Sequence, residues 1–582
     1  MTPAVRLPRR NTFSVGAALA RAGGLAALVL CSCANQQSPQ GGPIDVTPPQ
    51  VLATDPPKNT VNFRGNRITV EMDKYVDQRS FEESVFISPY VGSLEFDWSG
   101  KEVEIAFSEA LRLNTTYVVN IGTDVVDLNN RNRMANAFVL AFSTGPDIDH
   151  GAIEGRVFPR SPDDPVSGVM IFAYRLDGTN PDTLNPQTLR PGFITQTGSA
   201  GAFFLHHIPF GAYRVYAVRD QYRNLLYDPE ADDFGVQSMP VFLSPSDTLV
   251  AGLFMQLSKE DTTAPRLVRA EAVGENHVLL TFSEPVAADT IGAGAFSVFD
   301  TLARASLAVR GMFCPIGRAD AVELVTGTQD STAYYRVFAR GIRDSSGNRL
   351  SAIANSAVFQ GSGRRDTLAT RLVAISIPDS SITVSLDENI RISFSDAIAL
   401  PDPSAIADLR DSRGVQVPTI VRKKDDARVE LEPHALLTPA SWYRLTVHLR
   451  GIKDWAGKGV RDSIRVMHFR TFDPEDRSSI EGAVRDSRGP DRGSGYVIHA
   501  RRIGTNETTE YTATTDSAGR FLFQNILDGR YVLQAFFDVD RNGRYDAGRP
   551  FPFLPSEPLS LPTDTLKVRA RWPLEGVTVR FP

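Results

Sequence analysis

One sequence pattern occurs twice, in two segments that lie far apart in the chain. Each copy consists of a glycine, a stretch with alternating apolar residues, a second glycine and a tyrosine. The first copy is built on Gly201, Phe203, Ile208, Gly211 and Tyr213, and the same residue types recur at a constant offset at positions 519, 521, 526, 529 and 531. Glycine turns that enclose a strand with alternate apolar residues are typical of β-sandwiches. The duplication therefore predicts two small β domains of one kind.

A second pattern occurs three times. Each copy begins with a short alternating strand and continues to a tyrosine-bearing strand that ends in an Asp turn. The early strands cover residues 68–72, 278–282 and 390–394, the tyrosines are Tyr117, Tyr335 and Tyr443, and the turns begin at Asp127, Asp344 and Asp454. The first copy closes with Phe-Ser-Thr and the third with Phe-Arg-Thr, whereas the middle copy lacks such an ending. This pattern predicts three further β domains.

Both patterns resemble known families. The threefold pattern, with an Asp-x-x-Pro-Pro opening at residues 45–49, resembles the bacterial Ig-like domain of surface-layer proteins and bacterial lipoproteins. The twofold pattern resembles the carboxypeptidase regulatory-like, or prealbumin-like, β-sandwich. The second resemblance implies a binding or spacer module without peptidase activity, because this sandwich lacks the metal centre of the enzyme after which it is named.

The repeats and the length of 582 residues predict an all-β chain with five tandem β-sandwich domains. The predicted segments are a signal peptide at 1–32, a flexible tether at 33–44, Ig-like domains at 45–146, 261–361 and 365–473, and regulatory-like domains at 148–258 and 476–582. Because the linkers are short, we expect an elongated particle. Its radius of gyration should lie well above the roughly 25 Å of a single globule of this length.

The start of the chain has the pattern of a bacterial lipoprotein leader. A basic region precedes the apolar run at 22–30, which is too short to span a bilayer. The run leads to Cys33, which follows the small Ser32 and resembles the lipidated cysteine of a lipobox. Cys31 does not fit, because Leu30 directly before it is too large. The resemblance implies that Cys33 carries a lipid anchor, and an ordinary cleaved signal is the alternative.

Composition excludes several functions. The 62 Lys and Arg residues and 68 Asp and Glu residues give a net charge of −6, so no basic excess is available for nucleic-acid phosphates. Apart from Cys31 and Cys33 near the start, Cys314 is the only cysteine, which excludes an intramolecular disulfide and a Cys-based zinc site in the remaining chain. The sequence has neither a Gly-x-Ser-x-Gly elbow nor a His-Glu-x-x-His motif. We therefore expect no enzymatic activity.

One segment has the residue types of a calcium loop. Oxygen-bearing residues occupy positions 1, 3, 5 and 9 of residues 538–546, Gly543 allows a sharp turn, and residue 7 can offer its backbone carbonyl. The candidate ligands are Asp538, Asp540, Asn542, Arg544 and Asp546. The stretch resembles EF-hand and dockerin loops, but Arg549 replaces the bidentate Glu at position 12. We therefore expect a dissociation constant of about 10⁻⁴ M or weaker. A tight turn without an ion is the alternative.

The first copy of the twofold pattern contains a sister loop at residues 220–228. It has Tyr222 in place of Asp540 and Leu225 in place of Gly543. A ring cannot replace a charged ligand, so we expect that this loop does not bind the ion.

These features predict a lipid-anchored, non-enzymatic scaffold or adhesion protein of the bacterial envelope or cell surface. Its partners would be the membrane, through the N-terminal anchor, and a protein or glycan. Ala34 after the lipidated cysteine resembles the sorting pattern for the outer membrane, where the protein would face the periplasm or the exterior. An accessory subunit of an envelope enzyme or of an export or uptake system is the alternative.

Overall fold

The computed structural model describes residues 45–582 except 179, 288–290, 400–401, 461–462, 488–492 and 506–508. The described chain is almost entirely β, as predicted, with one short α-helix, α1 (Gln78–Glu82). Within the described residues, no helix has the length and apolar character needed to cross a membrane. The predicted signal peptide and the whole tether at 33–44, with Cys33, lie outside these residues.

The three domains with the threefold pattern share one strand order. In the first domain, one sheet is β1 (Val51–Asp55), β2 (Arg67–Met72), β5 (Glu102–Phe107) and β4 (Leu94–Ser99), and the other is β3 (Val85–Ser88), β6 (Thr116–Ile121) and β7 (Phe138–Ser143). In the third domain, the sheets are β17 (Leu267–Gly274), β18 (His277–Phe282), β22 (Ala321–Thr326) and β21 (Val309–Phe313), and β20 (Ser306–Leu307), β19 (Phe296–Asp300), β23 (Tyr334–Ala339) and β24 (Ser356–Gln360).

The fourth domain extends the same plan. Its sheets are β25 (Leu372–Ile375), β27 (Ile390–Phe394), β32 (Arg428–Pro433) and β31 (Thr419–Asp425), and β26 (Ser381–Val384), β35 (Ile464–Thr471), β33 (Trp442–His448), β29 (Ala407–Asp411) and β30 (Gln416–Val417). A two-stranded ribbon joins β28 (Ile398–Ala399) to β34 (Lys453–Asp454).

A tyrosine in each of these domains ties its strand to the preceding loop and to the neighbouring strand of the same sheet. The hydroxyls of Tyr117, Tyr335 and Tyr443 each accept a hydrogen bond from the backbone N–H five residues earlier, at 2.8, 2.9 and 2.7 Å. Each ring stacks on a phenylalanine of the closing strand, with centroids 5.5–5.7 Å apart. In the middle copy this partner is Phe359, so that domain keeps the aromatic pair although its sequence lacks the Phe-x-Thr ending.

The second and fifth domains share a different sandwich. In the second domain, β10 (Phe193–Gln196), β9 (Met170–Arg175), β12 (Gly211–Arg219), β13 (Asp233–Val236) and β16 (Ser258–Lys259) form one sheet with β14 (Val241–Leu243) on β12, and β11 (Ala202–Ile208), β8 (Gly151–Phe158) and β15 (Leu249–Gln256) form the other. In the fifth domain, the sheets are β38 (Glu510–Thr514), β37 (Tyr496–Ile503), β40 (Gly529–Phe537) and β41 (Leu566–Val568), and β39 (Arg520–Ile526), β36 (Ser478–Asp486) and β42 (Leu574–Phe581).

A glycine at the same place in β8 and β36 explains the Ile-Glu-Gly sequence that opens both domains. A Cβ on Gly155 would lie 2.0 Å from a carbonyl oxygen of β15, and a Cβ on Gly482 would lie 2.1 Å from a carbonyl oxygen of β42. The ring of Phe203 or Phe521 covers the same spot from the other side. No larger residue fits between this ring and the parallel neighbouring strand.

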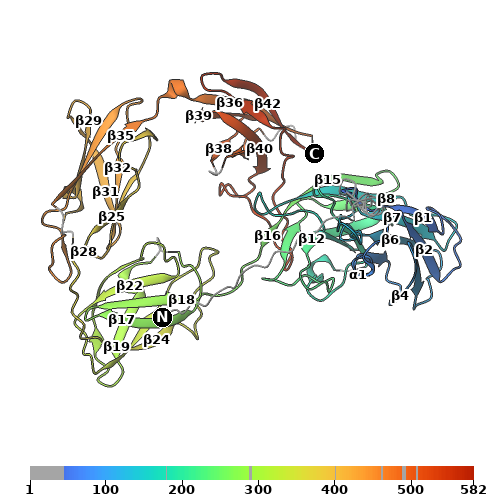
Figure 1. Ribbon diagram of the computed structural model, residues 1–582, viewed down its shortest axis with the longest axis horizontal. Coiled ribbons are helices and arrows are strands. Elements are labelled where there is room, and N and C mark those ends of the chain that lie inside the picture. The colour runs from blue at the N-terminus through green and yellow to red at the C-terminus, as the bar shows by residue number, and fades with distance from the viewer. Residues whose placement is uncertain are drawn as a thin grey trace, which may run out of the picture.

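The chain closes into a ring, because the fifth domain returns to the second (Figure 1). Phe553 lies over β12, with its ring centroid 3.4 Å from the Arg214 guanidinium and 6.3 Å from the Tyr216 ring. The Tyr216 hydroxyl donates a hydrogen bond to the Pro550 carbonyl at 3.2 Å, and the Ser556 hydroxyl donates to the Val236 carbonyl at 2.8 Å. The five domains therefore form a closed ring, and the expected radius of gyration above that of a single globule stays a prediction.

Burial on both faces of one sheet drives this closure. The inner face of the sheet that contains β9 and β12 packs into the core of the second domain, and its outer face forms a second apolar cluster. Phe86 of the first domain and Phe553 of the fifth domain cover that outer face. Accordingly, β9 is apolar at consecutive positions rather than alternate ones, which is the pattern of a strand that is buried on both sides.

We expect Phe553→Arg to open the ring. Burial of a phenylalanine contributes roughly 1.5–3 kcal/mol, and the new guanidinium would face Arg214. Small-angle scattering of residues 45–582 should therefore show a larger radius of gyration for the variant than for the parent. Leu554→Arg is the matched control, because Leu554 is 51% exposed and should leave the particle unchanged. Equal radii for parent and Phe553→Arg would contradict the closed ring.

Candidate calcium loop

The predicted calcium loop follows β40 and folds around the carboxylate of Asp538. This side chain is almost fully buried, and its two oxygens accept the backbone N–H groups of Asn542 and Gly543 at 3.1 and 2.8 Å. Asp540 is exposed, and its carboxylate accepts the backbone N–H of Asn542 at 3.0 Å. Gly543 has a φ of +76°, in the left-handed region that favours glycine.

A carboxylate that the sequence pattern did not include completes the site. Glu557 is buried and accepts the N–H of Val539 at 2.6 Å and the N–H of Asp546 at 3.1 Å. One oxygen each from Asp538, Asp540 and Glu557 lie within 4.8 Å of one another. Burial, together with the nearby Asp546 and Asp538 carboxylates, raises the pKa of Glu557. Glu557 thus supplies the acidic group that the loop lacks at position 12.

The other predicted ligands take supporting positions. The amide of Asn542 bridges the carboxylates of Asp540 and Asp546 at 2.9 and 3.2 Å. The backbone N–H of Arg544 donates to the Asn542 side-chain oxygen at 2.7 Å. Asp546 is therefore tied to Asn542 and is not part of the three-carboxylate group.

The sister loop in the second domain is built by the same hydrogen bonds. Asp220 accepts the N–H groups of Asn224 and Leu225, as Asp538 does with its counterparts. Asp232 is fully buried and accepts the N–H groups of Gln221 and Asp228, at 2.9 and 2.8 Å. Asp232 therefore corresponds in space to Glu557. A gap-free alignment misses this match, because the segment between loop and carboxylate is longer in the fifth domain.

The same hydrogen bonds form the turn in both loops, although the two loops differ in their carboxylates. The sister loop adopts this turn although Tyr222, which is 68% exposed, replaces the third carboxylate. The fold of the loop therefore does not depend on a cation. The fifth domain differs by having three carboxylates in one place, and clustered hard oxygens are the ligands that Ca²⁺ prefers.

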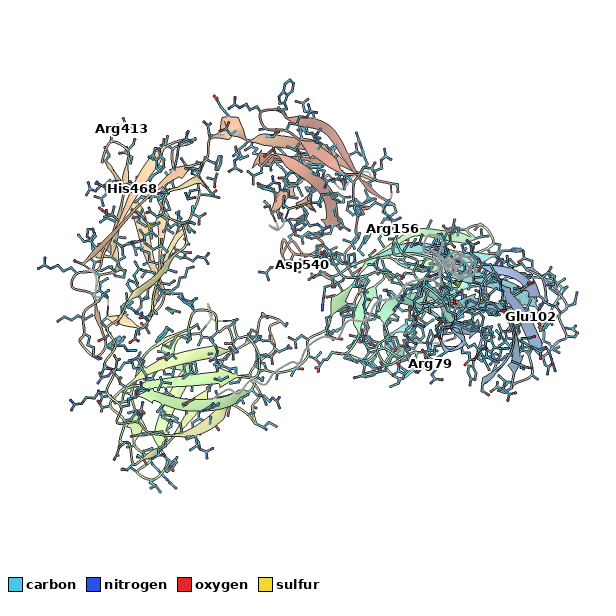
Figure 2. The ribbon with its side chains drawn as sticks, viewed as in Figure 1. Arg79, Glu102, Arg156, Arg413, His468 and Asp540 are labelled. Carbon is cyan, nitrogen blue, oxygen red and sulfur yellow. The ribbon has the colours of Figure 1, made fainter. Side chains whose placement is uncertain are left out.

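The loop also lies beside the contact between the fifth and second domains, which closes the ring. Tyr545, next to Asp546, packs into an apolar cluster with Phe158 and Phe254 of the second domain. Figure 2 labels Asp540 on the side of the fifth domain that faces the second domain. A cation at this loop would therefore hold a segment that the interface uses.

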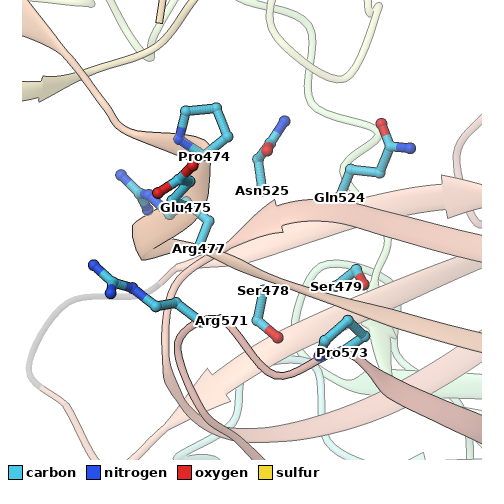
Figure 3. A pocket seen from close by; sticks show the side chains of 9 residues that line it. All are labelled: Pro474, Glu475, Arg477, Ser478, Ser479, Gln524, Asn525, Arg571 and Pro573. Carbon is cyan, nitrogen blue, oxygen red and sulfur yellow. The ribbon is translucent and has the colours of Figure 1, made fainter. Parts of the chain in front are cut away.

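A cavity of about 500 Å³ lies where the fourth domain meets the fifth (Figure 3). Three of its lining side chains are engaged with neighbouring residues. Arg571 pairs with Asp476 at 2.6 Å, and the Ser478 hydroxyl donates to the Trp572 carbonyl at 2.5 Å. Arg477 lies 4.8 Å from the ring centroid of Phe472. These contacts stiffen the linker between the two domains.

Comparison with known proteins identifies two of the five domains. Residues 45–144 and 366–471 match the model of the bacterial Ig-like domain, so the chain contains this domain at two places. Because the third domain has the same strand order and tyrosine anchor, it is a third domain of the same architecture. No curated protein matches the sequence of the chain.

The solved structures to which this chain is similar share little sequence with it. Domains 1–6 of the surface-layer protein SbsC are 9% identical, with 90% of this chain and 67% of that chain covered and a TM-score of 0.17. The major pilin subunit BcpA of Bacillus cereus is 10% identical over 74% of this chain and 99% of that one, with a TM-score of 0.13.

L,D-transpeptidase 3 from Mycobacterium tuberculosis is 11% identical over 26% of this chain and 45% of that one, with a TM-score of 0.14. The chain likewise covers 44% of the N-terminal part of SbsC, at 11% identity and a TM-score of 0.16.

If the loop binds calcium, its backbone should become more protected. At a tenfold excess over the dissociation constant, mass action stabilises the bound state by about 1.4 kcal/mol, or tenfold in an opening equilibrium. Hydrogen exchange of residues 538–557 in the mature chain should slow accordingly in calcium relative to chelator. Asp540→Tyr should abolish this change. The loop at 220–232 is the internal control and should not respond, and an equal response in both loops would indicate non-specific binding.

Proposed function

We propose that this chain, with bacterial Ig-like domains at residues 45–144 and 366–471, is a lipid-anchored, non-enzymatic scaffold of the bacterial cell surface that presents a binding surface to a protein or glycan. The observation that carries the proposal is the closed ring of five sandwiches, each with its own apolar core. A ring resists bending at its linkers, because motion at one junction requires motion at the others. Such a frame is suited to hold a surface at a constant distance from an anchor.

The position of the proposed anchor indicates which domains of the ring would lie nearest the membrane. The described chain begins at residue 45 in the first domain, which lies at one end of the long axis (Figure 1). The third and fourth domains lie at the opposite end. A lipid on Cys33 would therefore place the first and second domains near the membrane and the third and fourth domains farthest from it.

The contact between the first and second domains supports this role as a stiff base. Asn120 donates to the Ile194 carbonyl at 2.6 Å, and the Thr123 N–H donates to the Gln196 side chain at 2.9 Å. All three residues that take part, Asn120, Thr123 and Gln196, are buried. The hydrogen bonds that the Asn120 amide and the Gln196 side chain make across this contact restrict the relative orientation of the two domains, although the Asn120 Oδ1 itself has no partner.

Calcium at the Asp538 loop would add to the stiffness of the frame. The loop adjoins Tyr545, which packs against the second domain, so a filled site would hold the ring-closing segment in place. Millimolar calcium outside a cell is sufficient for a weak site of this kind. The outer membrane is the location that this proposal assigns to the protein.

The anchor is tested by Cys33→Ala. A tri-acylated cysteine buries far more CH₂ groups than any other feature of this acidic chain could replace, at about 0.8 kcal/mol each. The variant should move from the membrane fraction to the soluble envelope fraction, as measured by immunoblot after a salt wash. Cys31→Ala is the matched control and should stay with the membrane. Retention of Cys33→Ala on washed membranes would contradict lipid anchoring.

The partner is tested by capture from intact cells with the tagged, anchored chain. We expect recovery of a glycan or a matrix protein, because the proposal assigns a binding surface to the ring. The Phe553→Arg variant, which opens the ring, should recover less of it. Recovery of one envelope enzyme in a fixed ratio would instead support an accessory subunit.

A further inference from the structure

The three Ig-like domains gather side chains at one corresponding place. Three segments meet there: the entry to the domain, the residue pair after the early strand, and the Asp turn. The residues are Asp45, Lys74 and Asp127 in the first domain, Asp261, Glu284 and Asp344 in the third, and Asp366, Asp396 and Asp454 in the fourth. In both the third and fourth domains, one oxygen from each of the three carboxylates lies within 4.8 Å of the others.

In the first domain an ammonium group occupies this place. The Lys74 Nζ lies 2.6 Å from the Asp45 carboxylate, 2.6 Å from the Thr47 hydroxyl and 2.7 Å from the Thr47 carbonyl. A cation among oxygens is thus part of the fold in this domain. The third and fourth domains have Glu284 and Asp396 at the position of Lys74, so they add a negative charge where the first domain has a positive one.

The Asp turn of the fourth domain leaves one carboxylate oxygen without a partner. In the first and third domains an asparagine amide, from Asn132 or Asn348, donates to the second oxygen of the turn aspartate, at 2.7 and 2.9 Å. The fourth domain has Lys458 instead, whose backbone N–H binds only the first oxygen of Asp454, at 2.8 Å. Asp454 is 3% exposed, and its Oδ2 has no hydrogen-bond partner.

From this geometry we infer that the carboxylates of Asp366, Asp396 and Asp454 bind a divalent cation of the hard, oxygen-preferring class, such as Ca²⁺. The unpartnered Oδ2 of Asp454 belongs to a buried side chain of the three-carboxylate group, and a buried anionic oxygen without a partner is costly. A cation would satisfy this oxygen together with those of its two neighbours.

The charges around the group are consistent with a divalent ion. The ammonium of Lys458 lies 2.9 Å from an Asp366 oxygen and also contacts the Asp366 carbonyl. One ammonium against three carboxylates leaves an excess of two negative charges, which a divalent cation offsets.

The site lies at the junction between two domains. His277 of the third domain places its Nε2 3.8 Å from the Asp396 carboxylate, and its Nδ1 lies 2.9 Å from Glu323. A cavity of about 500 Å³, lined in part by His277, Glu323, Asp366 and Asp396, opens beside the group and gives an ion access. In Figure 1 this junction lies near β28, at the end of the ring far from the first domain. Because Asp366 lies where the chain enters the fourth domain, a bound ion would fix this entry segment against the Asp turn, next to the third domain.

Terbium luminescence in the mature chain tests the site. Tb³⁺ binds at calcium sites and emits when a nearby indole is excited, and Trp455 directly follows Asp454. We expect indole-sensitised emission that Ca²⁺ displaces and that Trp455→Phe removes. Asp454→Asn should weaken Tb³⁺ binding at least tenfold. Asp540→Tyr in the fifth domain should leave the signal unchanged, which separates this site from the Asp538 loop.

A second variant, Asp396→Lys, tests the same site in case Asp454→Asn does not fold. Asp396→Lys installs the residue that the first domain carries at this position, where the same architecture accommodates it. Its strand content and melting temperature should match the parent while the emission is lost. Emission that survives both substitutions, or that Ca²⁺ does not displace, would overturn the proposal.

Discussion

The packing of the second domain against the fifth is the contact on which the shape of the molecule depends. A sheet of the second domain is apolar on both faces, and neither face can remain in water without a large cost in free energy. The first domain covers part of the outer face with Phe86, and the fifth domain covers another part with Phe553. The chain therefore has to return to its second domain, and the third and fourth domains form the far side of the ring.

The repeated domains show how one architecture accepts different chemistry at a single position. The tyrosine hydroxyl and the aromatic stack anchor one strand to the preceding loop and to its neighbour, and they are the same in the first, third and fourth domains. The place where entry segment and Asp turn meet lies outside this core, so its residues can vary. Lys74 neutralises it in the first domain, whereas Glu284 and Asp396 make it acidic in the others. Such exchanges change what the domain can bind without changing how it folds.

The candidate loop likewise combines a common backbone with different side chains in the second and fifth domains. The turn is held by hydrogen bonds from backbone N–H groups to buried carboxylates, and these bonds are identical in kind in both copies. Only the exposed position differs, with Tyr222 in one and Asp540 in the other. The scaffold of the loop is therefore a property of the fold, and the ability to gather three carboxylates is a property of one copy.

Local patterns in the sequence determined the β class, the two kinds of repeat and the identity of the aromatic anchors. These features depend on residues close together in the chain, because strand alternation and glycine turns act over a few positions. The residue types of the loop at 538–546 could be recognised for the same reason. Glu557 could not, because an insertion separates it from the loop and only folding brings it back.

The closed ring and the group around Asp454 were decided by tertiary structure alone. The continuous apolar stretch of β9 shows that a strand is buried on both faces, but not which domain covers it. Likewise, the unpartnered oxygen of Asp454 arises because Lys458 stands where its sister domains have an asparagine. The effect of such a substitution on the hydrogen bonds of Asp454 can be judged only when the surrounding donor groups are known. Contacts between residues hundreds of positions apart depend on how whole domains pack, and no local pattern encodes that packing.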